Sequence, residues 1–239
     1  MGSALLGCAA LAQAPETSTD SMSDDELRAY RKERVAELRK RAASAEPAQS
    51  DDGAVYGGIF FCTVYYTPME SGFTAERGFD ATPLAAPGLK GRTYGRDFLA
   101  AVKKEGYGRL VTPVDGLNYL RWAGEVTYAY AKVPLGRRGE VLEPRRSCAI
   151  SGRNSFLRQH DTIRIKSANV NGDLGADEWF ICDTGGGVHP LQIDLYWGED
   201  EPRGSVGRAR ARPAGTSFEY AFEVEVTAKP RDQKKPAEE

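Results

Sequence analysis

Short segments in which apolar and polar residues alternate follow one another along the chain from about residue 55 onward. A period of two, with Gly, Pro, Asn and Asp between the segments, is typical of β-strands joined by turns. The segments with this pattern, or with a run of aromatic and β-branched residues, are 58–68, 125–136, 147–152, 161–168, 178–184, 191–198 and 217–230. We therefore expect a mainly β fold, a barrel with one or two short helices.

Two segments have a helical pattern instead. Residues 95–108 place Phe98, Leu99 and Val102 on one side of a helix that ends at Gly106. Nearer the N-terminus, a serine and a glutamate at positions 23 and 26 form a capping box at the start of a charged helix. Its apolar stripe is thin, so we expect a solvated helical extension outside the barrel.

Composition divides the chain into four parts. Residues 1–14 resemble the end of an export signal, with Cys8 in a lipoprotein-like Leu-Leu-Gly-Cys sequence; the alternative is a disordered, alanine-rich start. Residues 15–53 are a polar linker with the charged helix, 54–200 hold the barrel, and 201–239 add a strand and a disordered tail. The sequence contains no run of 18 apolar residues, so it predicts no transmembrane helix. These features indicate an exported protein of the periplasm, cell envelope or medium.

The net charge limits which partners the chain can bind, and the number of cysteines limits which disulfides it can form. The net charge of -2 provides no basic field for nucleic acid. With Cys8 set aside as a candidate for lipidation, Cys62, Cys148 and Cys182 remain, an odd number. Either Cys148 and Cys182 form a disulfide, or all three are buried thiols that pack as small apolar residues.

Two aspartates stand out within residues 178–198. On the second strand of this segment, Leu191, Ile193, Leu195 and Trp197 point one way, whereas Gln192, Asp194 and Tyr196 point the other way. The first set belongs in a core, so we expect Asp194 to face solvent or a groove. Asp183 ends the preceding strand, before three glycines, where it can accept hydrogen bonds from loop N–H groups.

These carboxyls admit more than one chemistry. A groove-facing carboxyl beside Tyr196 is suited to a sugar site, because aromatic faces pack against pyranose rings and partial burial raises the pKa of an acid. The Asp-Thr-Gly triplet at 183–185 matches that of aspartic proteases, but it occurs once, so a protease would have to be a homodimer. No Gly-Lys-Ser/Thr follows the glycines, and His160 and His189 lack metal-ligand spacing. We expect neither a phosphate loop nor a metal site.

Three segments resemble a known family. The sequence CDTGGGVHPLQIDLYWG at 182–198 is similar to the signature of the three-aspartate (3D) domain, found in the membrane-bound lytic transglycosylase A family and in stationary-phase muralytic proteins. The YYTP at 65–68 is similar to the family's Gly-Tyr-Tyr-Thr/Glu-Pro segment, and 147–165 is similar to its following strand and turn. The resemblance covers about residues 55–200.

The resemblance implies a double-psi β-barrel that cleaves the glycosidic bond between the two amino sugars of peptidoglycan. Asp194 would be the single acid/base, Asp183 would support it, and no cofactor or metal would be needed. The candidate substrate-binding residues are Tyr66, Thr67, Gly185, Gly186, His189, Gln192 and Tyr196. The expected partner is peptidoglycan or a related polysaccharide, bound by a monomer that Cys8 could anchor to a membrane.

The chain departs from the family pattern at three places. Ser151 stands where the first aspartate would fall, His189 replaces the loop lysine, and Pro190 follows it in place of glycine. The large inserted domain of the family is expected to be absent, because only a short insertion at 68–147, with the helix at 94–106, separates the matching segments. A non-catalytic glycan-binding or wall-loosening barrel is therefore the alternative function.

Overall fold

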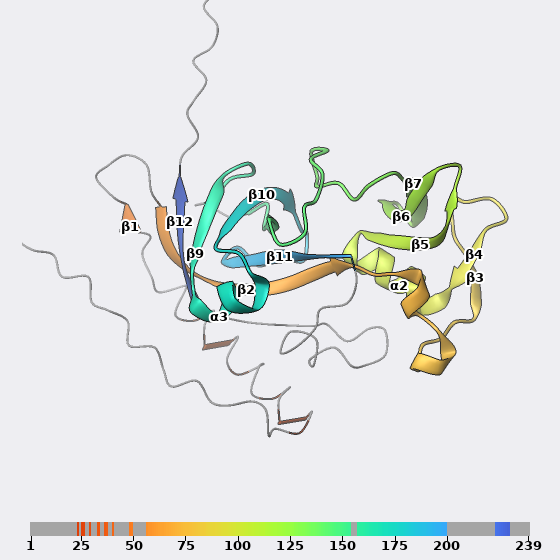
Figure 1. Cartoon of the computed structure of the whole chain (residues 1–239), viewed down its shortest axis with the longest axis horizontal. Coiled ribbons are helices and arrows are strands. Elements are labelled where there is room, and N and C mark those ends of the chain that lie inside the picture. Colours follow the sequence, from red (N-terminus) through yellow and green to blue (C-terminus); the bar gives the residue numbers. More distant parts are fainter. Residues whose placement is uncertain are drawn as a thin grey trace, which may run out of the picture.

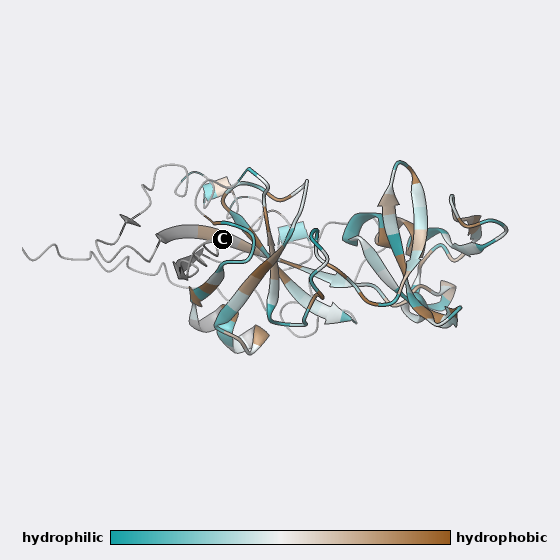
Figure 2. Cartoon of the chain, turned by 90° about the horizontal axis from the view of Figure 1, so that it is seen from above, coloured by the Kyte–Doolittle hydropathy of each residue, from teal (hydrophilic) through white to brown (hydrophobic). Residues whose placement is uncertain are grey.

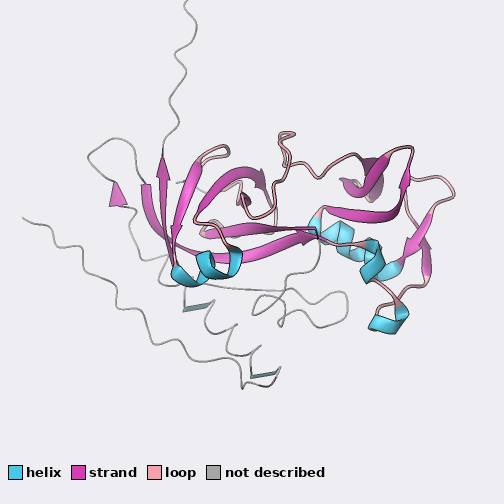
Figure 3. Ribbon diagram, in the orientation of Figure 1, coloured by secondary structure: helices cyan, strands magenta, loops and turns pink. Residues whose placement is uncertain are grey.

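The computed structural model describes residues 56–153 and 157–199, the short strands at 48–49 and 223–229, and scattered positions between 23 and 40. The described residues form two lobes, one around the longest strands and a smaller one at the opposite end of the molecule (Figure 1). Figure 2 shows the same two lobes from above, and Figure 3 shows that strands predominate in both. The prediction of a mainly β fold with short helices is confirmed.

The first lobe contains a seven-stranded sheet. Strand β2 pairs in parallel with β11, and β8 pairs in parallel with β10, while the remaining pairs are antiparallel. The order is β1-β2-β11-β8-β10-β9-β12, and β12 pairs with β2 as well as with β9. The strands are β1 (Ala48–Gln49), β2 (Tyr56–Thr67), β8 (Ser147–Ile150), β9 (Thr162–Lys166), β10 (Glu178–Thr184), β11 (Gln192–Glu199) and β12 (Glu223–Lys229).

Strand β12 corresponds to the strand predicted at 217–230. Its described part is Glu223–Lys229, so the predicted residues 217–222 and 230 lie outside the described residues. It pairs with β2 over residues 56–61 and with β9 over residues 162–166. The described part of the C-terminal extension, Glu223–Lys229, is therefore a strand of the main sheet.

The alternation along β11 has the predicted consequence. Ile193, Leu195 and Trp197 belong to the main core of the first lobe, with Leu191 packed against it. The helix α3 (Ala168–Leu174) lies beside this lobe, and its Val170 and Leu174 are fully buried in the same core. The sequence did not indicate α3 specifically.

A smaller core lies on the other face of the strands β2, β8, β10 and β11. It contains Tyr65, Leu142, Ala149, Cys182 and Tyr196. Cys148 belongs to the main core and Cys182 to this second one, although their strands are neighbours. The two thiols therefore face away from each other, and the predicted Cys148–Cys182 disulfide is wrong. Cys62, Cys148 and Cys182 are buried free thiols, which confirms the alternative.

The second lobe is the segment inserted between β2 and β8, and it is more than the short insertion that the sequence predicted. It has its own core, which contains Phe73, Phe98, Leu99, Val102 and Leu120 among others. The predicted helix is confirmed as α2 and ends before Gly106. The elements of this lobe are η1 (Glu70–Gly72), η2 (Ala75–Arg77), β3 (Pro83–Ala85), β4 (Thr93–Gly95), α2 (Arg96–Glu105), β5 (Tyr107–Val114), β6 (Leu117–Gly124) and β7 (Thr127–Ala131).

Hydrogen bonds connect the two lobes where β11 ends. The Arg109 backbone N–H donates to the Pro68 carbonyl oxygen at 2.7 Å. The Arg109 guanidinium donates to the Tyr119 hydroxyl at 2.7 Å and lies 3.4 Å from the Glu199 carboxylate, to which the Tyr119 hydroxyl also donates. Glu199, the last residue of β11, is thus held by two strands of the inserted lobe.

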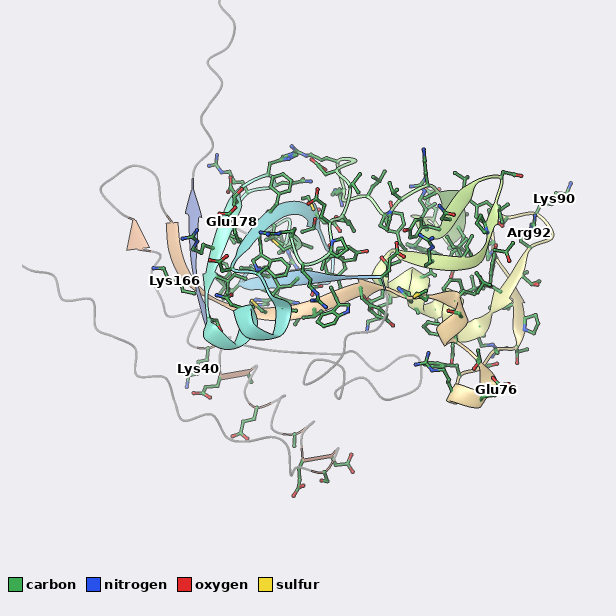
Figure 4. All side chains as sticks on the ribbon, viewed as in Figure 1. Lys40, Glu76, Lys90, Arg92, Lys166 and Glu178 are labelled. Atoms are coloured by element: carbon green, nitrogen blue, oxygen red, sulfur yellow. The ribbon has the colours of Figure 1, made fainter. Side chains whose placement is uncertain are left out.

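The charged N-terminal segment begins with the predicted capping box. The predicted capping box is confirmed, because the Ser23 N–H donates to the Glu26 carboxylate at 2.8 Å and the Glu26 N–H donates to the Ser23 hydroxyl at 3.4 Å. Figure 4 shows Glu76, Lys90 and Arg92 projecting from the inserted lobe. Among the described residues, none of the helices has the length and apolar character needed to cross a bilayer.

Candidate active site

Asp194 lies near the start of β11, between β2 and β8. Its register partners are Thr63 of β2 and Ala149 of β8. The Thr63 hydroxyl donates to Asp194 Oδ1 at 2.7 Å and accepts a hydrogen bond from Gln192 Nε2 at 2.6 Å. The Gln192 side-chain oxygen in turn accepts from the His189 N–H at 3.0 Å. A chain of hydrogen bonds therefore fixes the orientation of the carboxyl from the adjoining strand and loop.

Burial raises the pKa of Asp194 to about 7, and the hydrogen bond from Thr63 opposes this rise. Two charged residues at the end of α2 act on the same carboxyl: Glu105 raises its pKa and Lys104 lowers it. The direction agrees with the sequence-based expectation for a partly desolvated carboxyl. An acid with a pKa near neutrality can both donate and accept a proton at physiological pH, as general acid–base catalysis requires.

Asp183 is the next-to-last residue of β10, and it binds two backbone N–H groups. Its Oδ1 accepts hydrogen bonds from the Thr184 N–H at 2.8 Å and from the Arg137 N–H at 3.0 Å. Asp183 thus accepts from backbone N–H groups, but not from those of the glycine loop that the sequence suggested: Thr184 is the last residue of β10, and Arg137 comes from the distant segment between β7 and β8. Burial raises the pKa of Asp183, and these two hydrogen bonds work in the opposite direction.

The loop between β10 and β11 is folded tightly against β8. The Gly185 N–H donates to the Ile150 carbonyl oxygen at 3.1 Å, and the Val188 N–H donates to the Gly185 carbonyl oxygen at 3.2 Å. A Cβ atom at Gly185 would collide with the Val188 side chain, so the turn needs glycine there. His189 Nδ1 accepts from the Leu191 N–H at 3.2 Å. This loop conformation places the Gln192 side-chain amide beside the Thr63 hydroxyl.

The candidate substrate-binding residues divide into two groups. Gly185, Gly186, His189 and Gln192 lie on the loop that leads to Asp194, and Gly186 is exposed. Thr67 and Tyr196 are buried, and their hydroxyl oxygens lie 2.7 Å apart. Tyr66 is also buried, on the opposite face of β2 from Asp194, among the residues of the main core.

Four residues beside the carboxyls escaped the sequence analysis. Thr63 and Tyr65 share the face of β2 that looks toward Asp194, and Lys104 and Glu105 come from the inserted lobe. The alternation within β2 shows which residues share a face. Nothing local shows that β2 pairs with β11, or that α2 ends beside it. The ion pair between Lys104 and Glu105 has an N–O distance of 3.9 Å, and the Glu105 side chain is only 9% exposed.

Ser151, at the position of the missing first aspartate, is buried beyond the end of β8. Its hydroxyl accepts a hydrogen bond from the Arg153 N–H at 3.2 Å. The contacts of Asp183 and Asp194 described above form without a carboxylate at this position. Within the described ranges, no cluster of three His, Cys, Asp or Glu side chains is arranged to hold a metal ion.

Comparisons with known proteins give structural similarities only. No protein-family model matches the chain, and no curated protein sequence matches it. The structure is similar to E. coli MltA with bound chitohexaose (15% identity, TM-score 0.46, covering 75% of this chain and 77% of that one). It is also similar to a membrane-bound lytic murein transglycosylase from Agrobacterium tumefaciens (12% identity, TM-score 0.46, covering 82% and 84%) and to the lytic transglycosylase LtgG of Burkholderia pseudomallei (14% identity, TM-score 0.38, covering 87% and 84%). At these values the likeness assigns no function to the chain.

Proposed function

We propose that the protein is a peptidoglycan-cleaving lytic transglycosylase in which Asp194 is the single acid/base. The observation that carries the proposal is the Asp194 carboxyl near the start of β11: its pKa is raised to about 7, and a hydroxyl of the adjoining strand donates to it at 2.7 Å. This carboxyl lies in the segment 182–198 that resembles the three-aspartate signature.

The proposed reaction needs only one acid/base because the nucleophile belongs to the substrate. The protonated Asp194 gives its proton to the glycosidic oxygen as the bond from the muramyl C1 to that oxygen breaks. The 6-hydroxyl of the same muramyl residue bonds to C1, and its proton passes to the Asp194 carboxylate. The product is a 1,6-anhydro ring, no water is consumed, and the acid is regenerated. Intramolecular attack of this kind benefits from a high effective molarity.

The remaining site residues have supporting roles in this proposal. Asp183 holds the segment between β7 and β8 through Arg137. Gly185, Gly186, His189 and Gln192 would contact the glycan, while the buried Thr67 and Tyr196 would act by packing and Tyr66 by supporting β2. We further propose that the first lobe is a double-psi β-barrel, which its two parallel pairs and the pairing of β12 with both β2 and β9 support. Export, monomeric state and anchoring through Cys8 belong to the same proposal.

Digestion of purified sacculi tests the function. The wild type should release anhydromuropeptides detectable by mass spectrometry, and Asp194→Asn should reduce the rate by about 10²- to 10⁴-fold, the usual contribution of a general acid. The matched control is Asp177→Asn, an exposed carboxylate on the same lobe, which should retain the wild-type rate.

The products also separate the alternatives. Reducing sugar ends in place of anhydro ends would indicate a hydrolase. Binding of sacculi without any new ends would indicate a glycan-binding or wall-loosening module. Pepstatin-sensitive cleavage of peptides by a dimer would indicate an aspartic protease. Each of these results would overturn the proposed function.

A further inference from the structure

Tyr65 has a buried hydroxyl that neither the fold nor the proposed reaction explains. It lies on β2, on the same face as Thr63, and its ring packs at 5.1 Å from the ring of Tyr196. The side chain belongs to the second core with Cys182. Its hydroxyl oxygen is buried and has no hydrogen-bond partner among the residues that the structure describes.

Other enclosed tyrosine hydroxyls in the described parts of the chain are paired. The Tyr128 hydroxyl donates to the Leu99 carbonyl oxygen at 3.0 Å, and the Tyr94 and Tyr130 hydroxyls lie 2.8 Å apart. The Tyr196 hydroxyl is 2.7 Å from that of Thr67. A buried hydroxyl without a partner destabilises the folded state, so its retention requires an explanation. Phenylalanine would fill the same space without this cost.

Tyr65 belongs to the same core as Ala149 of β8, and Ala149 is the register partner of both candidate carboxyls, Asp183 and Asp194. Burial raises the pKa of Tyr65 most strongly, and the charges of Asp183 and Asp194 raise it further, together with the thiols of Cys182 and Cys148. The hydroxyl therefore stays protonated at physiological pH and is available as a neutral hydrogen-bond donor. One of the groups that act on this hydroxyl is Asp194, whose charge changes when it exchanges a proton.

We propose that Tyr65 is a positioning residue whose hydroxyl donates a hydrogen bond to the pair of carboxyls, Asp183 and Asp194, when Asp194 loses its proton. This inference rests on the proposed function. While Asp194 is protonated, the two carboxyls have enough hydrogen-bond donors: the Thr63 hydroxyl donates to Asp194, and two backbone N–H groups donate to Asp183. Once Asp194 is ionised, a buried negative charge appears, and a donor already in place stabilises it without reorganising solvent. The Tyr65 hydroxyl, which has no partner while Asp194 is protonated, becomes a hydrogen-bond donor when Asp194 is ionised.

The assignment differs from the one that the sequence supported. Within the YYTP segment the second tyrosine, Tyr66, was the expected binding residue, but it lies in the main core on the other face. The first tyrosine, Tyr65, faces the side of β2 on which Asp194 lies. One position along a strand exchanges the two faces of a sheet.

The test compares Tyr65→Phe with Tyr128→Phe, a tyrosine of the inserted lobe whose hydroxyl is paired. On sacculi, Tyr65→Phe should lower kcat by about 10- to 100-fold, the effect of one hydrogen bond to a charged group, with KM within about twofold of the wild type. Its pH–rate profile should move to higher pH, because losing a donor to the ionised form raises the pKa of the pair. Its Tm should be equal to or above that of the wild type. Tyr128→Phe should lower Tm and keep the wild-type kcat and pH profile.

A second measurement does not depend on catalysis. Titration of ¹³C-labelled aspartate carboxyls by NMR, assigned with Asp183→Asn and Asp194→Asn, should give a higher pKa for the pair in Tyr65→Phe and no change in Tyr128→Phe. The other charged groups acting on the pair are Lys104 and Glu105 of α2, and Arg137 and Glu140 before β8. All four are the same in both variants.

The two measurements separate the inference from the proposed function. If the wild type does not digest sacculi, the proposed function is wrong, and the NMR titration still decides whether Tyr65 donates to the carboxyls. The inference is overturned if Tyr65→Phe titrates as the wild type does. It is equally overturned if the wild type is active and the variant keeps its kcat and pH profile.

Discussion

At the scale of single residues, Asp194 combines two opposed requirements. Burial between two strands gives the carboxyl a pKa suited to proton transfer, and the same burial disfavours its charged form. Thr63 supplies a hydrogen bond that reduces this penalty without removing it. A residue placed for chemistry in this way is expected to cost the protein stability at neutral pH.

We expect Asp194→Asn to be more stable than the wild type at pH 8 but not at pH 3. The folded-state pKa of about 7 lies above the unfolded value of about 3.8, so the folded state binds the extra proton between these limits. Stability associated with this group is complete below pH 3.8 and is lost as the pH rises through 7. The gain from substitution is at most about 4 kcal/mol at pH 8. Urea denaturation at both pH values measures it.

A matched control is available for this experiment. Asp177→Asn removes an exposed carboxylate of the same lobe, and its urea denaturation at the two pH values is the reference for the gain seen with Asp194→Asn. If Asp194→Asn showed equal stability gains at pH 3 and pH 8, the raised pKa would not be the cause.

Sequence alternation identified the face that Asp194 and Gln192 share, and it placed Ile193, Leu195 and Trp197 in the core correctly. It could not identify Thr63 as the hydrogen-bond donor. A period of two gives two faces for each strand but does not say which strands become neighbours, and β2 and β11 are far apart in sequence. The residues around the carboxyl were therefore predictable only on its own strand.

At the scale of elements, the segment between β7 and β8 is fixed to the end of β10. The Arg137 N–H donates to Asp183, and Gly136 lies so close to β10 that a Cβ atom there would collide with the Cys182 carbonyl oxygen. A connecting segment thus sets the position of a candidate site residue. Glycine at this point is required by close approach of two backbones.

Gly136→Ala is expected to destabilise the protein and to disturb Asp183. The methyl group must displace backbone, which costs about 1–3 kcal/mol, as overpacking of a core does. Displacement would also weaken the hydrogen bond from Arg137, so the pKa of Asp183 should rise. Urea denaturation and NMR titration measure the two effects. Gly152→Ala, where nothing lies within 4 Å of the added atom, should change neither quantity by a measurable amount.

The two helices show why one element was predictable and the other was not. Helix α2 has three buried apolar residues at helical spacing and a glycine directly after its end. Helix α3 has seven residues, includes Gly172, and is capped by the Ser167 hydroxyl, which accepts from the Val170 N–H. A helix this short depends on packing of its Val170 and Leu174 against the core, and local propensity does not reveal such packing.

At the scale of the whole molecule, two features of the inserted lobe bear on the first lobe. One is the cluster of Arg109, Tyr119 and Glu199, and the other is the end of α2, whose Lys104 and Glu105 act on Asp194. The local pattern predicted α2 but not a second lobe. The pairing of β5, β6 and β7 depends on contacts that a strand-by-strand analysis does not define.

Glu199→Ala should weaken the connection between the lobes more than it lowers overall stability. Because Glu199 and Arg109 are partly exposed, the loss of stability is about 1 kcal/mol or less, and it should shrink at high salt. Single-tryptophan variants that keep Trp122 of the inserted lobe or Trp179 of the main core give two probes of urea unfolding. Their transitions should separate in Glu199→Ala. Coincident transitions would contradict this expectation, and Glu178→Ala serves as the exposed control.

The hydrogen bond between Thr63 and Asp194 joins residues 131 positions apart in the sequence. Strand β2 also pairs with β12, which is still more distant along the chain. Pairing over such separations is paid for in loop-closure entropy and makes folding slow compared with that of helical proteins. Until these strands meet, Asp194 is an ordinary solvated acid with no acid/base function near neutrality. A chain that is still being synthesised therefore has no assembled site. Under the proposed function, the activity against the cell wall would begin only when folding is complete.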